Sequence, residues 1–148
     1  MKTVSVPKPD FQILLVDDNN HGLIARKAVL EELGYKVATA KSGEEALELH
    51  AARKFDLIVT DYKMSKMTGV ELIQKVRKSG STIPIIMVSG FVEPLGLDEK
   101  STGADVVISK SAGEVGNLVR SINRLLRPPV TRTPPGSQKP APKSKAKA

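Results

Sequence analysis

The chain has 148 residues and no cysteine, which excludes a disulfide framework, a thiolate metal site and a cysteine nucleophile. Two histidines are too few for a zinc site built from histidine, and no apolar run is long enough to cross a membrane. The first residues do not have the pattern of a signal peptide, so we expect a cytoplasmic protein without membrane insertion.

Most of the net charge of +7 comes from the last 21 residues, 128–148. This segment has five basic residues, no acidic residue and six of the ten prolines, whereas residues 1–127 have 18 basic and 16 acidic residues, a balance of +2. We therefore expect an N-terminal extension in residues 1–10, one globular domain in residues 11–127, and a disordered basic tail rich in Pro, Lys and Ala in residues 128–148. A nearly neutral domain argues against DNA binding.

Five short apolar segments predict β-strands. Four of them lack the regular polar alternation of a half-exposed strand, which favours strands that are buried on both faces, as in a parallel sheet. The segment at residues 35–40 is weaker and half-alternating. The segments are residues 13–16, 35–40, 57–59, 83–88 and 106–108.

Helical patterns separate these strands. The predicted helices cover residues 23–33, 44–49, 70–77 and 115–126, and the last of them carries one apolar stripe from Val115 to Leu126. Ser42 and Glu45 have the spacing of a capping box. Residues 91–102 contain proline and glycine, so we expect a short or irregular helix there. The alternation of strands and helices predicts an α/β fold, with a parallel sheet covered by helices on both faces.

Polar side chains follow four of the five predicted strands. Asp17 and Asp18 follow the first strand, Asp61 the third, Ser89 the fourth and Lys110 the fifth. Sites in open α/β sheets form at the carboxyl edge, where the strand order reverses. If the order is 2-1-3-4-5, the three aspartates converge and the other two residues lie beside them.

This set of residues suits phosphoryl chemistry on a metal-binding carboxylate cluster. Three carboxylates in one pocket repel one another, and a hard cation with oxygen ligands, such as Mg²⁺, relieves that repulsion. Lys110 could hold one phosphoryl oxygen, the Ser89 hydroxyl could donate to another, and Asp61 could be the nucleophile. Taken singly, the aspartates could instead be helix caps or turn residues, and Lys110 a solvated charge. The four strand ends together favour the functional interpretation.

Several segments resemble the receiver domain of two-component response regulators. The similarity extends over about residues 12–127, and residues 13–18, 57–64, 86–90 and 103–110 carry its motifs. The resemblance implies a flavodoxin-like, doubly wound α/β fold with a five-stranded parallel sheet in the order 2-1-3-4-5. Because we expect no second globular domain after residue 127, we expect a response regulator of the stand-alone, single-domain type.

The resemblance implies a role for each polar residue. Asp61 would accept a phosphoryl group from a sensor histidine kinase or a histidine phosphotransfer protein, with Ser89 as the switch hydroxyl and Lys110 as the phosphoryl-binding lysine. The Mg²⁺ ligands would be Asp17, Asp18, Asp61 and the backbone carbonyl of Lys63. Receivers catalyse only their own phosphorylation and dephosphorylation. We therefore expect no turnover enzyme, but a phosphorelay protein that signals by contact with a downstream protein target.

The sequence departs from the usual receiver pattern at three positions. Ser65 and Ser111 stand where prolines are usual, and Val107 replaces an aromatic residue that often precedes the lysine. A cis peptide before a non-proline residue costs roughly 2.5–4 kcal/mol, so we expect a trans bond between Lys110 and Ser111. The alternative function is a phosphorylation-independent pseudo-receiver, an adaptor module whose basic tail contacts an anionic partner.

Overall fold

One parallel sheet organises the chain, with its strands in the order β2-β1-β3-β4-β5. This order, expected from the resemblance, is seen in a computed structural model that describes residues 11–90, 96–111 and 113–126. The predicted extension (1–10) and tail (128–148) lie outside the described residues. The strands are β1 (Gln12–Val16), β2 (Lys36–Ala40), β3 (Leu57–Asp61), β4 (Ile85–Ser89) and β5 (Val106–Ser109).

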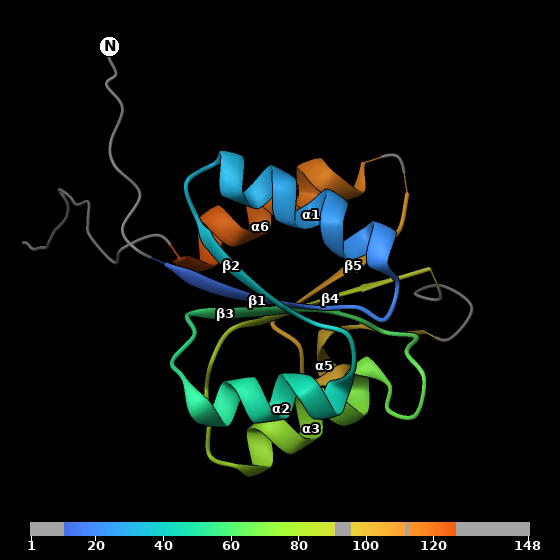
Figure 1. The fold of residues 1–148 in the computed structure, drawn as a ribbon. Helices are drawn as coiled ribbons and strands as arrows, with labels where there is room; N and C mark the ends of the chain where they lie inside the picture. Colours follow the sequence, from blue (N-terminus) through green and yellow to red (C-terminus); the bar gives the residue numbers. More distant parts are fainter. Residues whose placement is uncertain (1–10, 91–95, 112, 127–148) are drawn as a thin grey trace, which may run out of the picture.

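Helices cover both faces of the sheet, as predicted (Figure 1). On one face lie α1 (Asn20–Glu32) and α6 (Glu114–Leu126). On the other lie α2 (Gly43–Ala52), α3 (Gly69–Lys78) and the short α5 (Glu99–Thr102). Among the described residues, no helix combines the length and the apolar composition that a membrane span requires. The arrangement is the doubly wound, flavodoxin-like α/β fold.

The hydrophobic core has two halves, one on each face of the sheet. Along β1, Ile13 and Leu15 pack on the side of α1 and α6, whereas Leu14 and Val16 pack on the side of α2 and α3. All four side chains are at most 1% exposed. Two-sided burial is the physical reason why β1, β3 and β4 read as continuous apolar runs, whereas the edge strand β2 is only partly buried.

Side chains cap the starts of α2 and α3. The Ser42 hydroxyl accepts a hydrogen bond from the Glu45 N–H, as expected. The Glu45 carboxylate, however, accepts from the Lys41 N–H at 2.8 Å and not from Ser42, so the predicted capping box is only half formed. A complete box, with both reciprocal hydrogen bonds, joins Thr68 and Glu71 at α3.

Most observed elements differ from the predicted ranges by a few residues at their ends, and two of these differences have a clear physical reason or consequence. β4 begins at Ile85 and not at residue 83, because Pro84 has no N–H to donate to a neighbouring strand. The apolar stripe of α6 is shorter than predicted: Leu118 and Ile122 are buried, but Val115 in the first turn is 48% exposed. The sheet and helix order is unaffected by either difference.

β5 is an edge strand, because the described sheet ends with it. The Val107 N–H of this strand donates to a carboxylate oxygen of Glu99 in α5 at 3.0 Å. α5 is a single turn that ends at Gly103, which has a φ of +84°. This agrees with the expected short helix in residues 91–102, of which residues 91–95 lie outside the described part.

Candidate functional site

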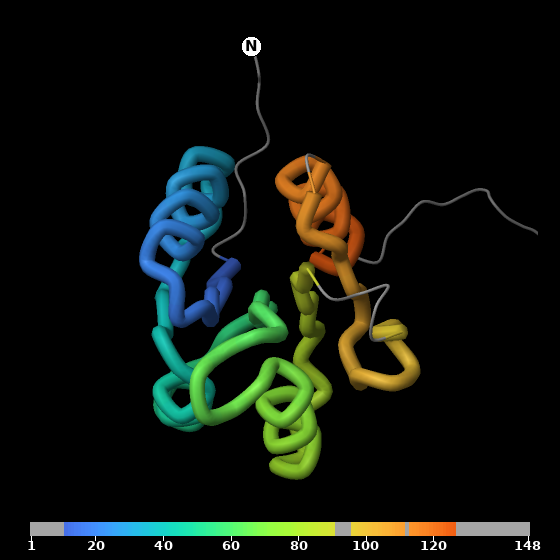
Figure 2. Tube along the Cα trace, turned by 90° about the vertical axis from the view of Figure 1, so that its right-hand side faces the viewer, coloured from blue at the N-terminus to red at the C-terminus, as the bar shows by residue number. Residues whose placement is uncertain are grey.

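The carboxyl ends of the strands meet at one edge of the sheet, the edge that Figure 2 faces. Asp17 directly follows β1, Asp61 is the last residue of β3, Ser89 is the last residue of β4 and Lys110 directly follows β5. The strand register places Asp61 level with Val88, next to Ser89. The topology therefore brings the predicted site residues to the same edge of the sheet.

Three aspartates form an acidic cluster at this edge. One carboxylate oxygen from each of Asp17, Asp18 and Asp61 lies within 4.8 Å of the other two. Asp17 and Asp61 are 1% and 5% exposed, whereas Asp18 is open to solvent. A hard divalent cation such as Mg²⁺ prefers carboxylate oxygens and keeps several waters. The donor set and its partial exposure therefore fit the predicted metal.

Neighbouring loops hold the aspartates in place. Asp17 Oδ1 accepts the Asn19 N–H at 2.9 Å, and the Asn19 side chain caps α1 by accepting the Gly22 N–H at 3.1 Å. Asp18 Oδ2 accepts the Ser65 N–H at 2.9 Å, which ties the loop after β3 to the loop after β1. The helix-cap interpretation of this acidic segment thus applies to Asn19, and α1 begins earlier than predicted.

Lys110 contacts the central carboxylate of the cluster. Its Nζ lies 3.0 Å from Asp61 Oδ1. Burial raises the pKa of Asp61, and the negative charge of the neighbouring Asp17 raises it further. The hydrogen bond and the positive charge of Lys110 lower it, but the net shift of the Asp61 pKa is upward. No cis peptide occurs in the described residues, so the bond between Lys110 and Ser111 is trans, as expected. The structure therefore places the Lys110 ammonium group beside a carboxylate whose charged form is disfavoured by burial.

The loop between β3 and α3 passes very close to Asp61. The Gly69 N–H donates to the Tyr62 carbonyl at 2.8 Å. A Cβ atom on Gly69 would lie 2.4 Å from the Asp61 carbonyl oxygen, so only glycine permits this approach. In the same loop Lys66 has a φ of 72°, a left-handed conformation that residues other than glycine rarely adopt. The loop is thus held tightly against the end of β3.

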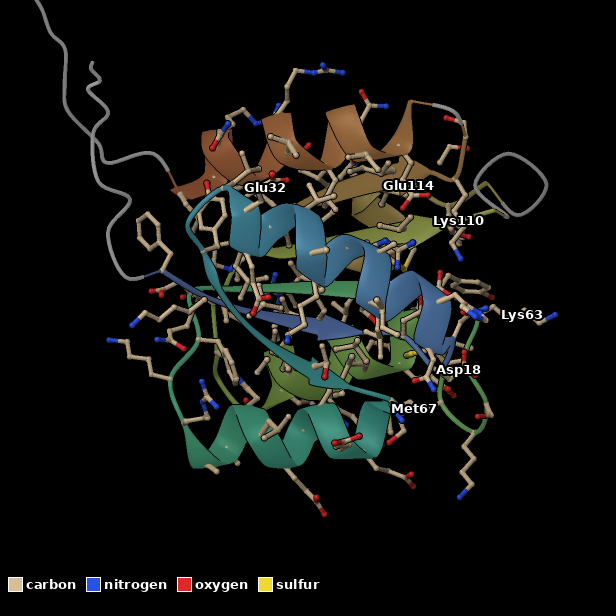
Figure 3. The ribbon with its side chains drawn as sticks, turned by 45° about the horizontal axis from the view of Figure 1, so that its top comes forward. Asp18, Glu32, Lys63, Met67, Lys110 and Glu114 are labelled. Carbon is tan, nitrogen blue, oxygen red and sulfur yellow. The ribbon has the colours of Figure 1, made fainter. Side chains whose placement is uncertain are left out.

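A small cavity of ≈ 280 Å³ opens beside the acidic cluster. Its lining residues are Asp18, Asn19, Asp61, Lys63, Gly90 and Lys110. Figure 3 shows Asp18, Lys63 and Lys110 at this end of the molecule, with the Lys63 side chain directed outward. Two larger hollows, of ≈ 690 Å³ along β5 and α6 and ≈ 620 Å³ between α3 and α5, contain none of the three aspartates. The chemistry, and not the size, identifies the smaller cavity as the candidate site.

Two predicted roles depend on atoms near this cavity. Ser89 is 1% exposed at the end of β4, and its carbonyl accepts the Lys110 N–H at 2.9 Å. Lys63 lines the cavity with its side chain outside. The switch role of the Ser89 hydroxyl and the metal-ligand role of the Lys63 carbonyl stay predictions.

The sequence interpretation missed a buried ion-pair network that reaches the acidic cluster. Arg26 in α1 is 9% exposed, and its Nη1 lies 2.9 Å from Asp17 Oδ2. Its Nε and Nη2 both lie 2.9 Å from Glu114 Oε2 at the start of α6. Burial disfavours the charged guanidinium, but the two carboxylates outweigh it and raise the pKa of Arg26. A sequence signal existed: Arg26 stands in the buried row of α1 with Leu23 and Leu30.

Comparisons with known proteins give a consistent result. A family model described as the response regulator receiver domain matches residues 13–123. The virulence sensor protein BvgS of Bordetella pertussis is 32% identical over 150 residues, 95% of this chain and 12% of that protein. The alkaline phosphatase synthesis transcriptional regulatory protein PhoP of Bacillus subtilis is 37% identical over 119 residues, 76% of this chain and 48% of that protein. The chain thus spans only part of these relatives.

Solved structures with the same fold include two response regulators that match this chain over nearly their whole length. The response regulator TrrA of Thermotoga maritima, solved in complex with Mg²⁺-BeF, has 31% identity and a TM-score of 0.71, and the match covers 78% of this chain and 99% of that chain. The chemotaxis response regulator CheY4 of Vibrio cholerae has 30% identity and a TM-score of 0.71, with 80% of this chain and 100% of that chain covered. With the family model matching most of its residues, the chain belongs to the response regulator receiver domain family.

Proposed function

We propose that this protein is a response regulator that accepts a phosphoryl group on Asp61 in a phosphorelay and signals by contact with other proteins. One observation carries the proposal. The Asp61 carboxylate borders an open cavity, with Lys110 Nζ at 3.0 Å and carboxylate oxygens of Asp17 and Asp18 within 4.8 Å. A nucleophile, a cation for the phosphoryl oxygens and a metal-binding pair are thus in one place.

The residues divide the work of phosphoryl transfer. An Asp61 carboxylate oxygen attacks the phosphorus of a phosphohistidine, the new oxygen–phosphorus bond forms as the nitrogen–phosphorus bond breaks, and the imidazole leaves with the bonding electron pair. Lys110 turns from Asp61 to a phosphoryl oxygen, and the Ser89 hydroxyl donates to another. Mg²⁺, when bound by the three aspartates, supplies positive charge that offsets charge on the transferring group. Water later hydrolyses the acyl phosphate, so the protein is a self-resetting switch and not a turnover enzyme.

The partners follow from this chemistry and from the relatives. The physiological donor is a sensor histidine kinase or a histidine phosphotransfer protein, as the resemblance to response regulators implies. PhoP carries the name of a transcriptional regulator and BvgS that of a sensor, so receivers of this kind serve different outputs. The receiver itself provides the signal, which passes to a downstream protein through its surface.

Phosphorylation with a small donor tests the proposal directly. The protein is incubated with acetyl phosphate and Mg²⁺, and covalent phosphate is measured by intact mass spectrometry. The wild-type protein is expected to gain one phosphate, whereas Asp61→Asn gains none, because an amide cannot form an acyl phosphate. Asp98→Asn is the matched control: Asp98 caps α5 on the exposed surface, and asparagine caps a helix equally well. Equal labelling of the Asp61→Asn protein would place the acceptor elsewhere, and no labelling of the wild-type protein would favour the adaptor function.

A further inference from the structure

The buried guanidinium of Arg26 contacts one of the carboxylates of the proposed metal site. Arg26 donates from Nη1 to Asp17 Oδ2 at 2.9 Å, while Asp17 Oδ1 accepts the Asn19 N–H at 2.9 Å. Both oxygens of this carboxylate are therefore already hydrogen-bonded before any ion arrives. Asp17 is 1% exposed, so water does little to screen the positive charge of Arg26.

The chain makes room for this contact with a specific glycine. A Cβ atom on Gly22 would lie 2.6 Å from Asp17 Oδ2 and 3.5 Å from Arg26 Nη1. Any larger residue at position 22 would have to displace the carboxylate or the guanidinium. Gly22 is in the first turn of α1, where glycine lowers the helix propensity. A residue that costs helix stability is thus used where the Asp17–Arg26 pair needs the space.

A second carboxylate holds the other side of the guanidinium. Glu114, in the first turn of α6, accepts a hydrogen bond from Nε of Arg26 at Oε2, and the same oxygen forms an ion pair with Nη2 at 2.9 Å. Figure 3 shows Glu114 at the same end of the molecule as Lys110. The rigid guanidinium fork suits this bridging role, which an ammonium group cannot fill in the same way. Asp17 and Glu114 therefore share one positive charge.

We propose that Arg26 is a positioning residue that sets the affinity of the acidic cluster for Mg²⁺, and that Glu114 controls how much of its charge acts on Asp17. The inference rests on the proposed metal site. The positive charge of Arg26 weakens the attraction of Asp17 for a dication. Glu114 reduces this weakening, because its carboxylate pairs with the same guanidinium and offsets part of the positive charge. Coupling between two sites is reciprocal. A dication at Asp17 therefore repels Arg26 toward Glu114, and the stronger Arg26–Glu114 pair stabilises the first turn of α6.

A titration with MgCl₂ at constant ionic strength, followed by amide NMR shifts at Asp18 and Asp61, tests the proposal. Arg26→Met removes the charge but keeps much of the length, and it is expected to tighten Mg²⁺ binding about ten-fold or more. Arg26→Lys keeps the charge and is expected to stay within about three-fold of the wild-type affinity. A purely structural role of Arg26 would not distinguish these variants by charge.

Glu114→Gln supplies the opposite test on a residue that does not contact the aspartates. With Arg26 drawn fully to Asp17, Mg²⁺ binding is expected to weaken about three-fold or more. In the Arg26→Met background the same change should have less than about half that effect, because Glu114 acts through the guanidinium. This variant also keeps the test valid if Arg26→Met does not fold.

The outcomes separate the two proposals. Mg²⁺ protection of amide exchange at the start of α6 in the wild-type protein, absent in Arg26→Met, would support the coupling. Unchanged or weaker binding in Arg26→Met, or a full Glu114→Gln effect without Arg26, would overturn the role of Arg26 while leaving the metal site intact. Absence of Mg²⁺ shifts at Asp18 and Asp61 in the wild-type protein would instead overturn the metal site itself.

Discussion

Replacing Gly69 by alanine puts one methyl group against the backbone of the proposed phosphoacceptor. The added Cβ atom would lie 2.4 Å from the Asp61 carbonyl oxygen and 3.2 Å from the Tyr62 Cα atom. A comfortable contact needs roughly 3.5 Å, so the start of α3 and the end of β3 must separate by about 1 Å. Both contacts are to backbone, which cannot turn away as a side chain can.

Two opposing effects determine the change in the free energy of unfolding of Gly69→Ala. Overpacking of a well-packed site costs typically about 1–3 kcal/mol, and a clash with backbone belongs at the upper end. Alanine recovers up to about 1 kcal/mol, because it loses less conformational freedom on folding than glycine. We therefore expect Gly69→Ala to lower the free energy of unfolding by about 2 kcal/mol. For a domain of roughly 100 residues this is a fall in Tm of about 8 °C.

Gly116→Ala provides a matched control with the same chemical change. Gly116 is exposed within α6, and the nearest atom to its added Cβ would be Arg120 Nη1 at 3.5 Å, the end of a flexible side chain. Here the helix propensity of alanine is the main effect, so we expect stabilisation by about 1 kcal/mol. Urea unfolding and thermal melting, both followed by circular dichroism, measure the two variants in parallel.

The same variants test whether Gly69 also positions the acceptor. Displacement of the Asp61 backbone should slow phosphate incorporation from acetyl phosphate in Gly69→Ala, while Gly116→Ala should react like the wild-type protein. A Tm of Gly69→Ala equal to or above that of the wild-type protein would refute the steric argument. It would mean that the loop and α3 can move away from β3 without cost.

Two further predictions concern the same edge of the sheet. Lys66→Gly should raise the free energy of unfolding by about 0.5–1 kcal/mol, because the left-handed conformation at this position costs a non-glycine residue about 1–2 kcal/mol. Glycine loses part of this gain because its unfolded chain is more flexible. The urea midpoint measures the change, and a lower midpoint than that of the wild-type protein would contradict this. The raised pKa of Asp61 means that the folded state binds its proton more tightly than the unfolded state. Without metal, protonated Asp61 therefore stabilises the fold at low pH. This stabilisation should be lost as the pH rises above about 4, the ordinary pKa of an aspartate, and through the higher pKa of Asp61 in the folded state. Asp61→Asn should lack this loss in urea unfolding over a pH series, and parallel pH profiles of the two proteins would argue against it.

The sheet and the site edge could be predicted because short-range patterns determine them. Strands buried on both faces require unbroken apolar runs, and the polar residue that ends each run falls at the carboxyl edge. Asp17, Asp61 and Lys110 were identified in this way. The strand order itself came from the family resemblance, and it is confirmed.

Features that depend on distant parts of the chain could not be predicted in this way. The pairing of Arg26 with Glu114 spans 88 residues and depends on how α1 and α6 pack together. Glu45 satisfied the spacing rule of a capping box, yet the chain before Ser42 offered the Lys41 N–H instead. Local rules name the available donors and acceptors, while tertiary geometry selects the pairs that form.

The hydrogen bond between Glu99 and Val107 has a consequence for self-association. Unpaired backbone donors along an edge strand are places where a strand of another molecule can add. The Glu99 carboxylate accepts the hydrogen bond of one such donor, the Val107 N–H. A strand that added at this edge would have to displace this carboxylate or bury its charge. Because Glu99 stands on a helix of one turn, which has little stability of its own, unwinding of these four residues would also open the sheet to strand addition and aggregation.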